Sequence, residues 1–173
     1  GVSAAITYFG RQEHGRFRLV SKFTAVEPFL NLEHRRRTHF RFSINAGEVI
    51  GEFEKGTPPL NRRLEALRKI VKAGYPTGLI IAPLFLDNGW EARYRDMLEQ
   101  VQNTLEGLEA PDTFELITHR FTARARQNIA EVFPDTKLVM EPELRQFKYG
   151  QFGYGKYVYP KELYEEAGEY FRD

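Results

Sequence analysis

The sequence has 173 residues, of which 42% are hydrophobic and 28% are charged, values typical of a globular protein long enough to bury a core. A net charge of +1 gives no overall basic signal for nucleic acid, so a site of that kind has to be a local patch. No run of about 20 apolar residues is present to span a membrane, and the absence of cysteine excludes disulfides and thiolate metal sites within this chain.

These features predict one domain, residues 1–173, in a monomeric cytoplasmic protein without a membrane span or a metal site of its own. The first residue is Gly1, and the pattern of residues 1–10 is typical of the middle of a helix. We therefore expect the chain to be a piece of a longer protein.

Apolar patterns predict four strands that alternate with helices. Strands are expected over residues 17–23, 39–45, 78–85 and 113–121. The third is an almost continuous apolar run, which is typical of a strand covered on both faces. Helical spacing of apolar residues predicts helices over 60–74, 88–107 and 122–134, with a short helix near the start of 46–59 and a surface helix in the acidic tail. Thr122 is expected to cap its helix. This alternation predicts an α/β fold with parallel strands.

Polar residues gather where the predicted strands end. In parallel α/β folds, the carboxyl ends of the strands meet at one edge, which is where ligands bind. The residues expected at this edge are Lys22, Ser43, Asn45, Ala82, His119 and Arg120. Together they suit an anionic or zwitterionic ligand, although each residue alone is more often structural.

The segment 145–160 combines rings, glycines and cations. Its aromatic residues mostly lie two positions apart, which predicts a strand or hairpin with the rings on one face. Rings that stack and lysines that neutralise phosphate suit nucleic acid, whereas the alternative is a hairpin whose tyrosines only pack. The basic run 34–41 is a solvated connection unless it faces the same edge.

Several blocks, in this order, resemble the spore photoproduct lyase family. They are FRLVSKF, THFRFSIN, EFEKGTPPLNRRLEA, KAGYPTGLIIAPLF with NGWEARY, TFELITHRFT and RQFKYGQFGYGKYVY. Members of this family are radical S-adenosylmethionine enzymes that repair a thymine dimer lesion in spore DNA by hydrogen abstraction with a 5′-deoxyadenosyl radical. The resemblance implies a partial (β/α) barrel of the radical SAM type, of which this chain holds the later strands, and a C-terminal β-hairpin.

The resemblance also implies roles for particular residues. Lys22, Ser43 and Ala82 match positions that bind S-adenosylmethionine. The region 137–160 matches the DNA-facing hairpin, which is expected near those positions. The DNA-binding residues implied there are Arg145, Gln146, Phe147, Lys148, Tyr149 and Lys156.

The chain departs from the family pattern in two respects. The CxxxCxxC motif that holds the 4Fe-4S cluster and the hydrogen-donor cysteine both precede this region in the family, so this chain ligates no cluster and holds no catalytic residue. Gln146, Phe147, Tyr149, Gln151 and Phe152 also stand where the family usually has Arg, Tyr, Trp, Arg and Tyr. The alternatives are a non-catalytic nucleic-acid-binding relative, a radical SAM protein acting on another substrate, and a domain that binds another phosphorylated ligand.

Overall fold

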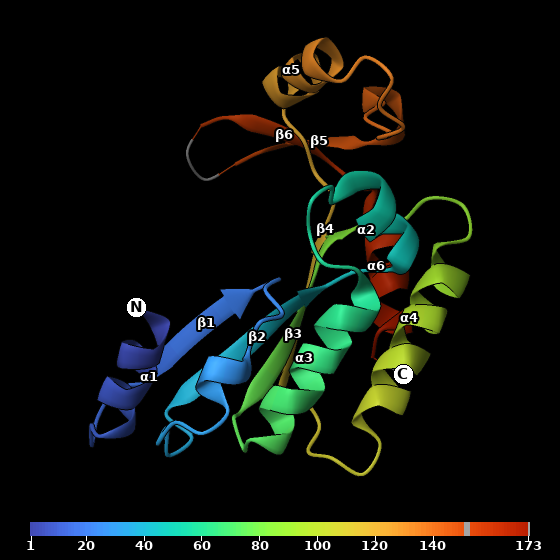
Figure 1. Ribbon diagram of the computed structural model, residues 1–173. Coiled ribbons are helices and arrows are strands. Elements are labelled where there is room, and N and C mark those ends of the chain that lie inside the picture. The colour runs from blue at the N-terminus through green and yellow to red at the C-terminus, as the bar shows by residue number, and fades with distance from the viewer. Residues whose placement is uncertain (151–152, 173) are drawn as a thin grey trace. The chain divides into compact units, whose positions relative to one another are not determined.

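The computed structural model describes residues 1–150 and 153–172, and these form two compact units. The first unit comprises residues 1–82 and 92–117, and the second comprises 83–91 and 118–173. The helices and short 3-10 turns (η) are α1 Val2–Gly10, η1 Glu27–Phe29, α2 Gly47–Phe53, α3 Leu60–Lys72, α4 Trp90–Leu105, α5 Ala123–Val132, η2 Pro142–Leu144 and α6 Lys161–Tyr170 (Figure 1). The strands are β1 Phe17–Ser21, β2 Thr38–Ile44, β3 Thr77–Leu84, β4 Thr113–Thr118, β5 Gln146–Tyr149 and β6 Gly155–Val158.

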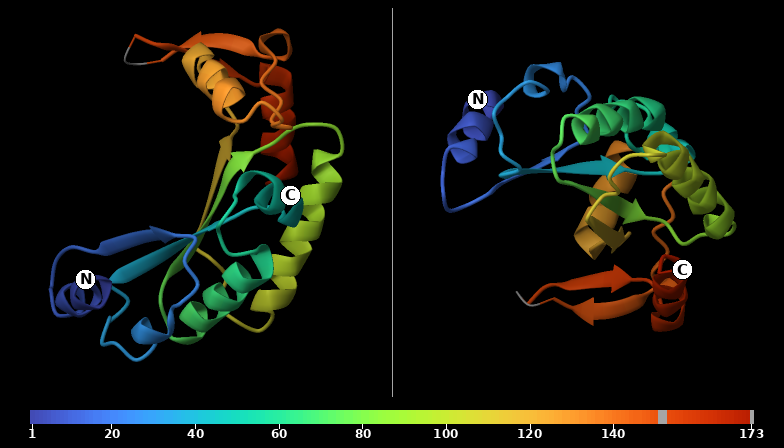
Figure 2. Two further views of the ribbon diagram at one scale, coloured as in Figure 1. Left: turned by 45° about the horizontal axis from the view of Figure 1, so that its top comes forward. Right: turned by 90° about the horizontal axis from the view of Figure 1, so that it is seen from below.

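Strands β1 to β4 form one sheet in the order of the sequence, and β1, β2 and β3 pair in parallel. In the register, Ser21 lies opposite Phe42 and Ser43 lies opposite Ile80. Helices α3 and α4 lie on the same side of this sheet (Figure 2). The predicted α/β class with parallel strands is thus confirmed, and so is the C-terminal hairpin, which forms a separate antiparallel sheet of β5 and β6.

The core of the first unit follows from the periodicity of its elements. Strand β2 buries Phe40 and Phe42, whereas Arg41 between them stays half-buried. The run in β3 is buried along most of its length, as expected for a strand covered on both faces. Helix α3 turns its apolar stripe, including Leu64 and Leu67, to this core.

All four strands end earlier than the sequence suggested, β2 and β3 by one residue and β1 and β4 by two and three. Strand β1 stops at Ser21 because the Ser21 hydroxyl accepts a hydrogen bond from the Phe23 N–H at 2.8 Å, a turn that leaves Lys22 just beyond the strand. Strand β4 stops at Thr118, and Phe121 forms an antiparallel bridge with Tyr157 of β6 instead. The predicted cap of α5 is confirmed, since the Thr122 side chain accepts from the Ala125 N–H.

Candidate functional site

The first candidate site lies at the carboxyl edge of the sheet in the first unit. Lys22 directly follows β1, Ser43 lies one residue before the end of β2, and Ala82 lies in the last part of β3. The parallel register therefore brings these predicted cofactor residues to one edge of the sheet. Asn45 directly follows β2 and is fully buried, and its side-chain oxygen accepts from the Ala46 N–H.

A buried guanidinium connects the elements at this edge. Arg63 of α3 has no solvent-exposed surface. It donates to the Ser43 carbonyl at 3.1 Å, to the Pro58 carbonyl at 2.7 Å and to the Thr57 hydroxyl at 2.7 Å. Its remaining contact is an ion pair with Glu54, whose carboxylate oxygen lies 2.7 Å away. The end of β2, the loop before α3 and α3 itself are therefore fixed to one another.

The same Glu54 oxygen also binds Lys22. The Lys22 ammonium lies 2.9 Å from Oε2 of Glu54, and the Lys22 side chain is about one-third exposed. The other carboxylate oxygen of Glu54, Oε1, is buried and has no hydrogen-bond partner among the described residues. The two cations Lys22 and Arg63 and the anion Glu54 give this cluster one net positive charge, which suits an anionic group of a ligand.

Sequence reasoning missed Glu54 and Arg63. The signal that was available is the position of Arg63, which is one turn from Leu60 and Leu67 on the apolar face of its helix. A charged residue on a buried stripe requires a partner, because an isolated buried charge is costly.

The residues predicted at the end of the fourth strand belong to the second unit. His119 is buried against the rings of Phe85 and Phe121, with ring centroids 4.9 and 5.9 Å away. Burial, helped by the positive charge of Arg145, lowers the pKa of His119 to about 4. Arg120 is exposed. A place for His119 and Arg120 on the same edge as Lys22 stays a prediction.

Arg145 is bound within the second unit. Its guanidinium donates to the His119 carbonyl at 3.0 Å and lies 3.5 Å from the centroid of the Tyr159 ring. Tyr159 is itself held by the Leu86 N–H, which donates to the Tyr159 hydroxyl at 3.0 Å. These contacts give Arg145 a structural role, and its predicted contact with DNA stays a prediction.

The hairpin of β5 and β6 separates its rings from its lysines. Phe147 lies opposite Tyr157, and the Phe147 ring also contacts Tyr149 edge-on at 5.2 Å. Lys148 lies directly opposite Lys156 on the other face. Like charges in direct register destabilise a strand pair, so this pair suits an anion that lies across both ammonium groups.

The rings of the hairpin remain partly open to solvent. Phe147 is 51% exposed and Tyr149 is 80% exposed, and Gln146 and Lys148 are also exposed. Gln151 and Phe152 belong to the same predicted segment, 145–160, but lie outside the described residues. A position of the hairpin near Lys22 and Ser43 stays a prediction.

The basic run 34–41 does not face the carboxyl edge of its unit. Arg35, Arg36 and Arg37 precede β2, at the opposite end of that strand from Ser43. Arg36 binds Glu109 with nitrogen and oxygen 2.7 Å apart, and Arg37 donates to the Glu13 carbonyl at 2.8 Å. Residues 34–37 are therefore a connection held by contacts within the unit, and residues 38–41 belong to β2.

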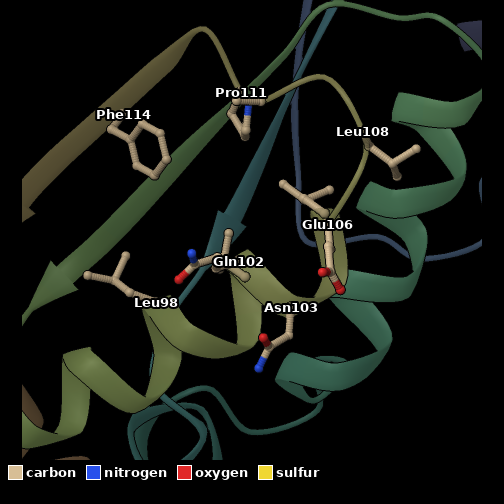
Figure 3. Close-up of a pocket in the computed structure, with 10 residues that line it drawn as sticks. Leu98, Gln102, Asn103, Glu106, Leu108, Pro111 and Phe114 are labelled. Atoms are coloured by element: carbon tan, nitrogen blue, oxygen red, sulfur yellow. The ribbon is translucent and has the colours of Figure 1, made fainter.

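A hollow of about 530 Å³ lies at a different place in the first unit, between α4 and the start of β4 (Figure 3). Leu98, Val101, Leu108 and Phe114 give it a largely apolar lining. Its lining includes none of the predicted site residues.

Within residues 1–150 and 153–172, no three His, Cys, Asp or Glu side chains are grouped to hold a metal ion. In the same residues, no helix has both the length and the apolar character needed to cross a bilayer.

Known proteins resemble this chain along almost all of its length. The family model described as spore photoproduct lyase matches residues 1–172. The spore photoproduct lyase of Bacillus subtilis (strain 168) is 46% identical over 148 residues, which are 85% of this chain and 43% of that protein. The spore photoproduct lyase of Clostridium acetobutylicum is 44% identical over 167 residues, or 96% of this chain and 49% of that protein.

Solved structures give the same result. A spore photoproduct lyase variant with bound AdoMet and dinucleoside spore photoproduct matches 99% of this chain and 51% of its own, at 40% identity and a TM-score of 0.92. Another variant, with dinucleoside spore photoproduct, matches with the same values. The chain thus spans about half the length of these relatives. On the match over residues 1–172 and these identities, the chain belongs to the spore photoproduct lyase family.

Proposed function

We propose that the protein to which this chain belongs is a radical S-adenosylmethionine lyase that repairs a thymine dimer lesion in DNA. The observation that carries this proposal is the likeness of nearly the whole chain, at 40% identity, to a structure that contains both AdoMet and the dinucleoside lesion. In this proposal, the first unit supplies part of the cofactor site, and the hairpin of the second unit binds DNA.

The carboxyl edge of the first unit fits S-adenosylmethionine. The only anionic group of this cofactor is its carboxylate, and the edge offers the Lys22 ammonium within a cluster of one net positive charge. Ser43 adds a hydroxyl, and Ala82 adds backbone groups. When bound, the cofactor supplies the radical chemistry, and the task of these residues is to bind and orient it.

The residues of this chain do not fit an iron–sulfur cluster. Such clusters are held by cysteine thiolates, and the chain has no cysteine. A cluster in the whole protein needs ligands from another part of that protein. The residues of this chain therefore have no role as ligands of the cluster.

The hairpin fits the phosphate and base chemistry of DNA. Lys148 and Lys156 form a cationic pair, and Phe147 and Tyr149 offer exposed rings for stacking. Gln146 adds an exposed amide at the start of β5, and Arg145 adds a guanidinium that is already bound to His119. Lysine–phosphate contacts contribute a binding free energy that depends on salt, and ring stacking contributes one that depends little on salt.

Lys148→Ala/Lys156→Ala in the whole protein tests the DNA assignment. We expect weaker binding to duplex DNA and a salt slope flatter by roughly 1.8, since each phosphate contact contributes about 0.9 to the slope. Tyr149→Ala should weaken binding by about 1–3 kcal/mol with an unchanged slope. Lys161→Ala is the matched control, because it removes an exposed lysine of the same unit that lies on α6. Unchanged affinity with a lower melting temperature would mean that the hairpin only packs.

The catalytic part has a separate test. We expect the whole protein, under reducing anaerobic conditions with S-adenosylmethionine, to convert dinucleoside spore photoproduct to two thymidines. Binding of lesion DNA without turnover or 5′-deoxyadenosine formation would instead identify the non-catalytic nucleic-acid-binding relative. Turnover of a different substrate would identify another radical SAM activity.

A further inference from the structure

The buried pair of Arg63 and Glu54 is placed to control the proposed cofactor residues. Arg63 contacts the backbone of Ser43, and Glu54 contacts the side chain of Lys22. Two of the three residues proposed to bind S-adenosylmethionine are therefore held through this one pair, although they lie on different strands.

Stability alone does not explain the number of contacts that this pair makes. A buried ion pair contributes little net stability, because desolvation of the two charges offsets their attraction. This pair uses four donor contacts of one guanidinium to fix Ser43, Thr57, Pro58 and Glu54. Such contacts define position, since each guanidinium nitrogen donates in a fixed plane.

Lys22 gains a defined position from the same arrangement. A lysine side chain has four rotatable bonds, and without a partner its ammonium samples many positions. Glu54, itself fixed by Arg63, holds the ammonium at 2.9 Å. An ammonium group has three donors, so Lys22 retains donors for a ligand carboxylate while it is bound to Glu54.

We propose that Arg63 and Glu54 are positioning residues that hold Lys22 and Ser43 for the carboxylate of the amino-acid part of S-adenosylmethionine. This inference rests on the proposed function, because that proposal supplies the cofactor. The pair touches the residues that bind the ligand and not the reacting atoms.

The test variant is Glu54→Met/Arg63→Met in the whole protein. It replaces the pair with apolar side chains of similar length and keeps the net charge of the cluster, since Lys22 remains as its only charge. The change therefore removes the contacts that position Lys22 and Ser43, without changing the net charge that attracts an anion. Arg63→Lys is a second variant, which keeps the charge of Arg63 and loses its forked geometry.

Two ligands separate positioning from folding. S-adenosylmethionine has the amino-acid part with its carboxylate, and 5′-methylthioadenosine keeps the nucleoside but lacks this whole part and the sulfonium charge. We expect both variants to bind S-adenosylmethionine about tenfold more weakly by calorimetry, and 5′-methylthioadenosine with unchanged affinity. Lys69→Met is the matched control, because it breaks an exposed ion pair of the same helix with Glu27 and should change neither affinity.

A background of Lys22→Met completes the design. In that background, the pair substitution should cause a smaller further loss of affinity for S-adenosylmethionine, because the ammonium is absent and only the position of Ser43 is still affected. If the pair substitution weakens both ligands equally, or leaves the affinity for S-adenosylmethionine unchanged, the inference is overturned. A loss of S-adenosylmethionine affinity in Lys22→Met alone would still support the cofactor site. Full affinity in Lys22→Met would overturn the cofactor assignment and the inference with it.

Discussion

His119 packs against two phenylalanine rings, and its backbone carbonyl accepts a hydrogen bond from Arg145. The ring thus has apolar neighbours and a cation nearby, and both effects disfavour the charged imidazolium. A pKa of about 4 keeps the ring neutral at physiological pH. At the residue scale, His119 is therefore an aromatic packing residue in the second unit and not a cation.

The depressed pKa of His119 makes stability depend on pH in a defined window. The unfolded chain takes up a proton near the ordinary pKa of 6.5, and the folded chain does so only near 4. The stability that neutral His119 contributes is thus complete above pH 6.5 and is lost as pH falls towards 4, by at most about 3 kcal/mol.

Urea unfolding between pH 4 and 7 measures this loss. We expect the pH dependence to be smaller in His119→Gln than in the unsubstituted chain, and unchanged in the control His14→Gln, whose ring is exposed. An equal pH dependence in all three proteins would show that His119 does not titrate as its burial requires.

At the element scale, the hairpin depends on a close approach of ring and backbone. Gly155 lies beside the ring of Phe147, and a Cβ built on Gly155 would lie 1.9 Å from Cζ of that ring. The missing side chain lets the ring lie over β6, where it contacts Tyr157 at a centroid distance of 5.3 Å. Tyr157 in turn stacks on Phe121, with centroids 5.1 Å apart, which ties the hairpin to the segment after β4.

Gly155→Ala should therefore displace the Phe147 ring and break its contact with Tyr157. We expect a loss of about 1 kcal/mol in the free energy of unfolding, the usual worth of an aromatic pair. Nuclear Overhauser effects between the two rings would report the displacement. In Gly168→Ala on α6, the added Cβ meets only an ordinary contact with Arg172, so this control should be stabilised by up to about 1 kcal/mol. Retained ring contacts in Gly155→Ala would contradict this account.

At the scale of the whole molecule, the chain combines a balanced charge with a complete absence of cysteine. The net charge of +1 hides local differences, because cations gather at the carboxyl edge of the first unit and on one face of the hairpin. The absence of cysteine leaves oxygen and nitrogen as the main side-chain ligands, and these do not replace the thiolates of an iron–sulfur cluster.

We accordingly expect this 173-residue chain, prepared alone, to hold less than stoichiometric iron and sulfide after anaerobic reconstitution. It should also form no 5′-deoxyadenosine from S-adenosylmethionine on reduction. Colorimetric iron analysis and chromatography measure these outcomes. A stoichiometric cluster on this chain would refute the assignment of the cluster ligands to another part of the protein.

The sequence by itself determined the class and order of the elements. Apolar runs and alternation located the four strands, and apolar spacing near 3.6 residues located their helices, because burial follows the geometry of the backbone. It also predicted the cap at Thr122 and the hairpin of glycines and aromatics. These features depend on residues that are close in the sequence, so the local sequence pattern was sufficient to predict them.

The tertiary structure alone decided the environment of each candidate residue. The link from Lys22 through Glu54 to Arg63 joins residues 32 and 9 positions apart, and no local pattern encodes such a pairing. Likewise, Phe121 pairs with Tyr157 beyond the end of β4, and His119 is neutral because it is buried against residues that include the remote Phe85. Charge and hydrogen bonding depend on what surrounds a group in space, and folding brings those surroundings together from remote parts of the sequence.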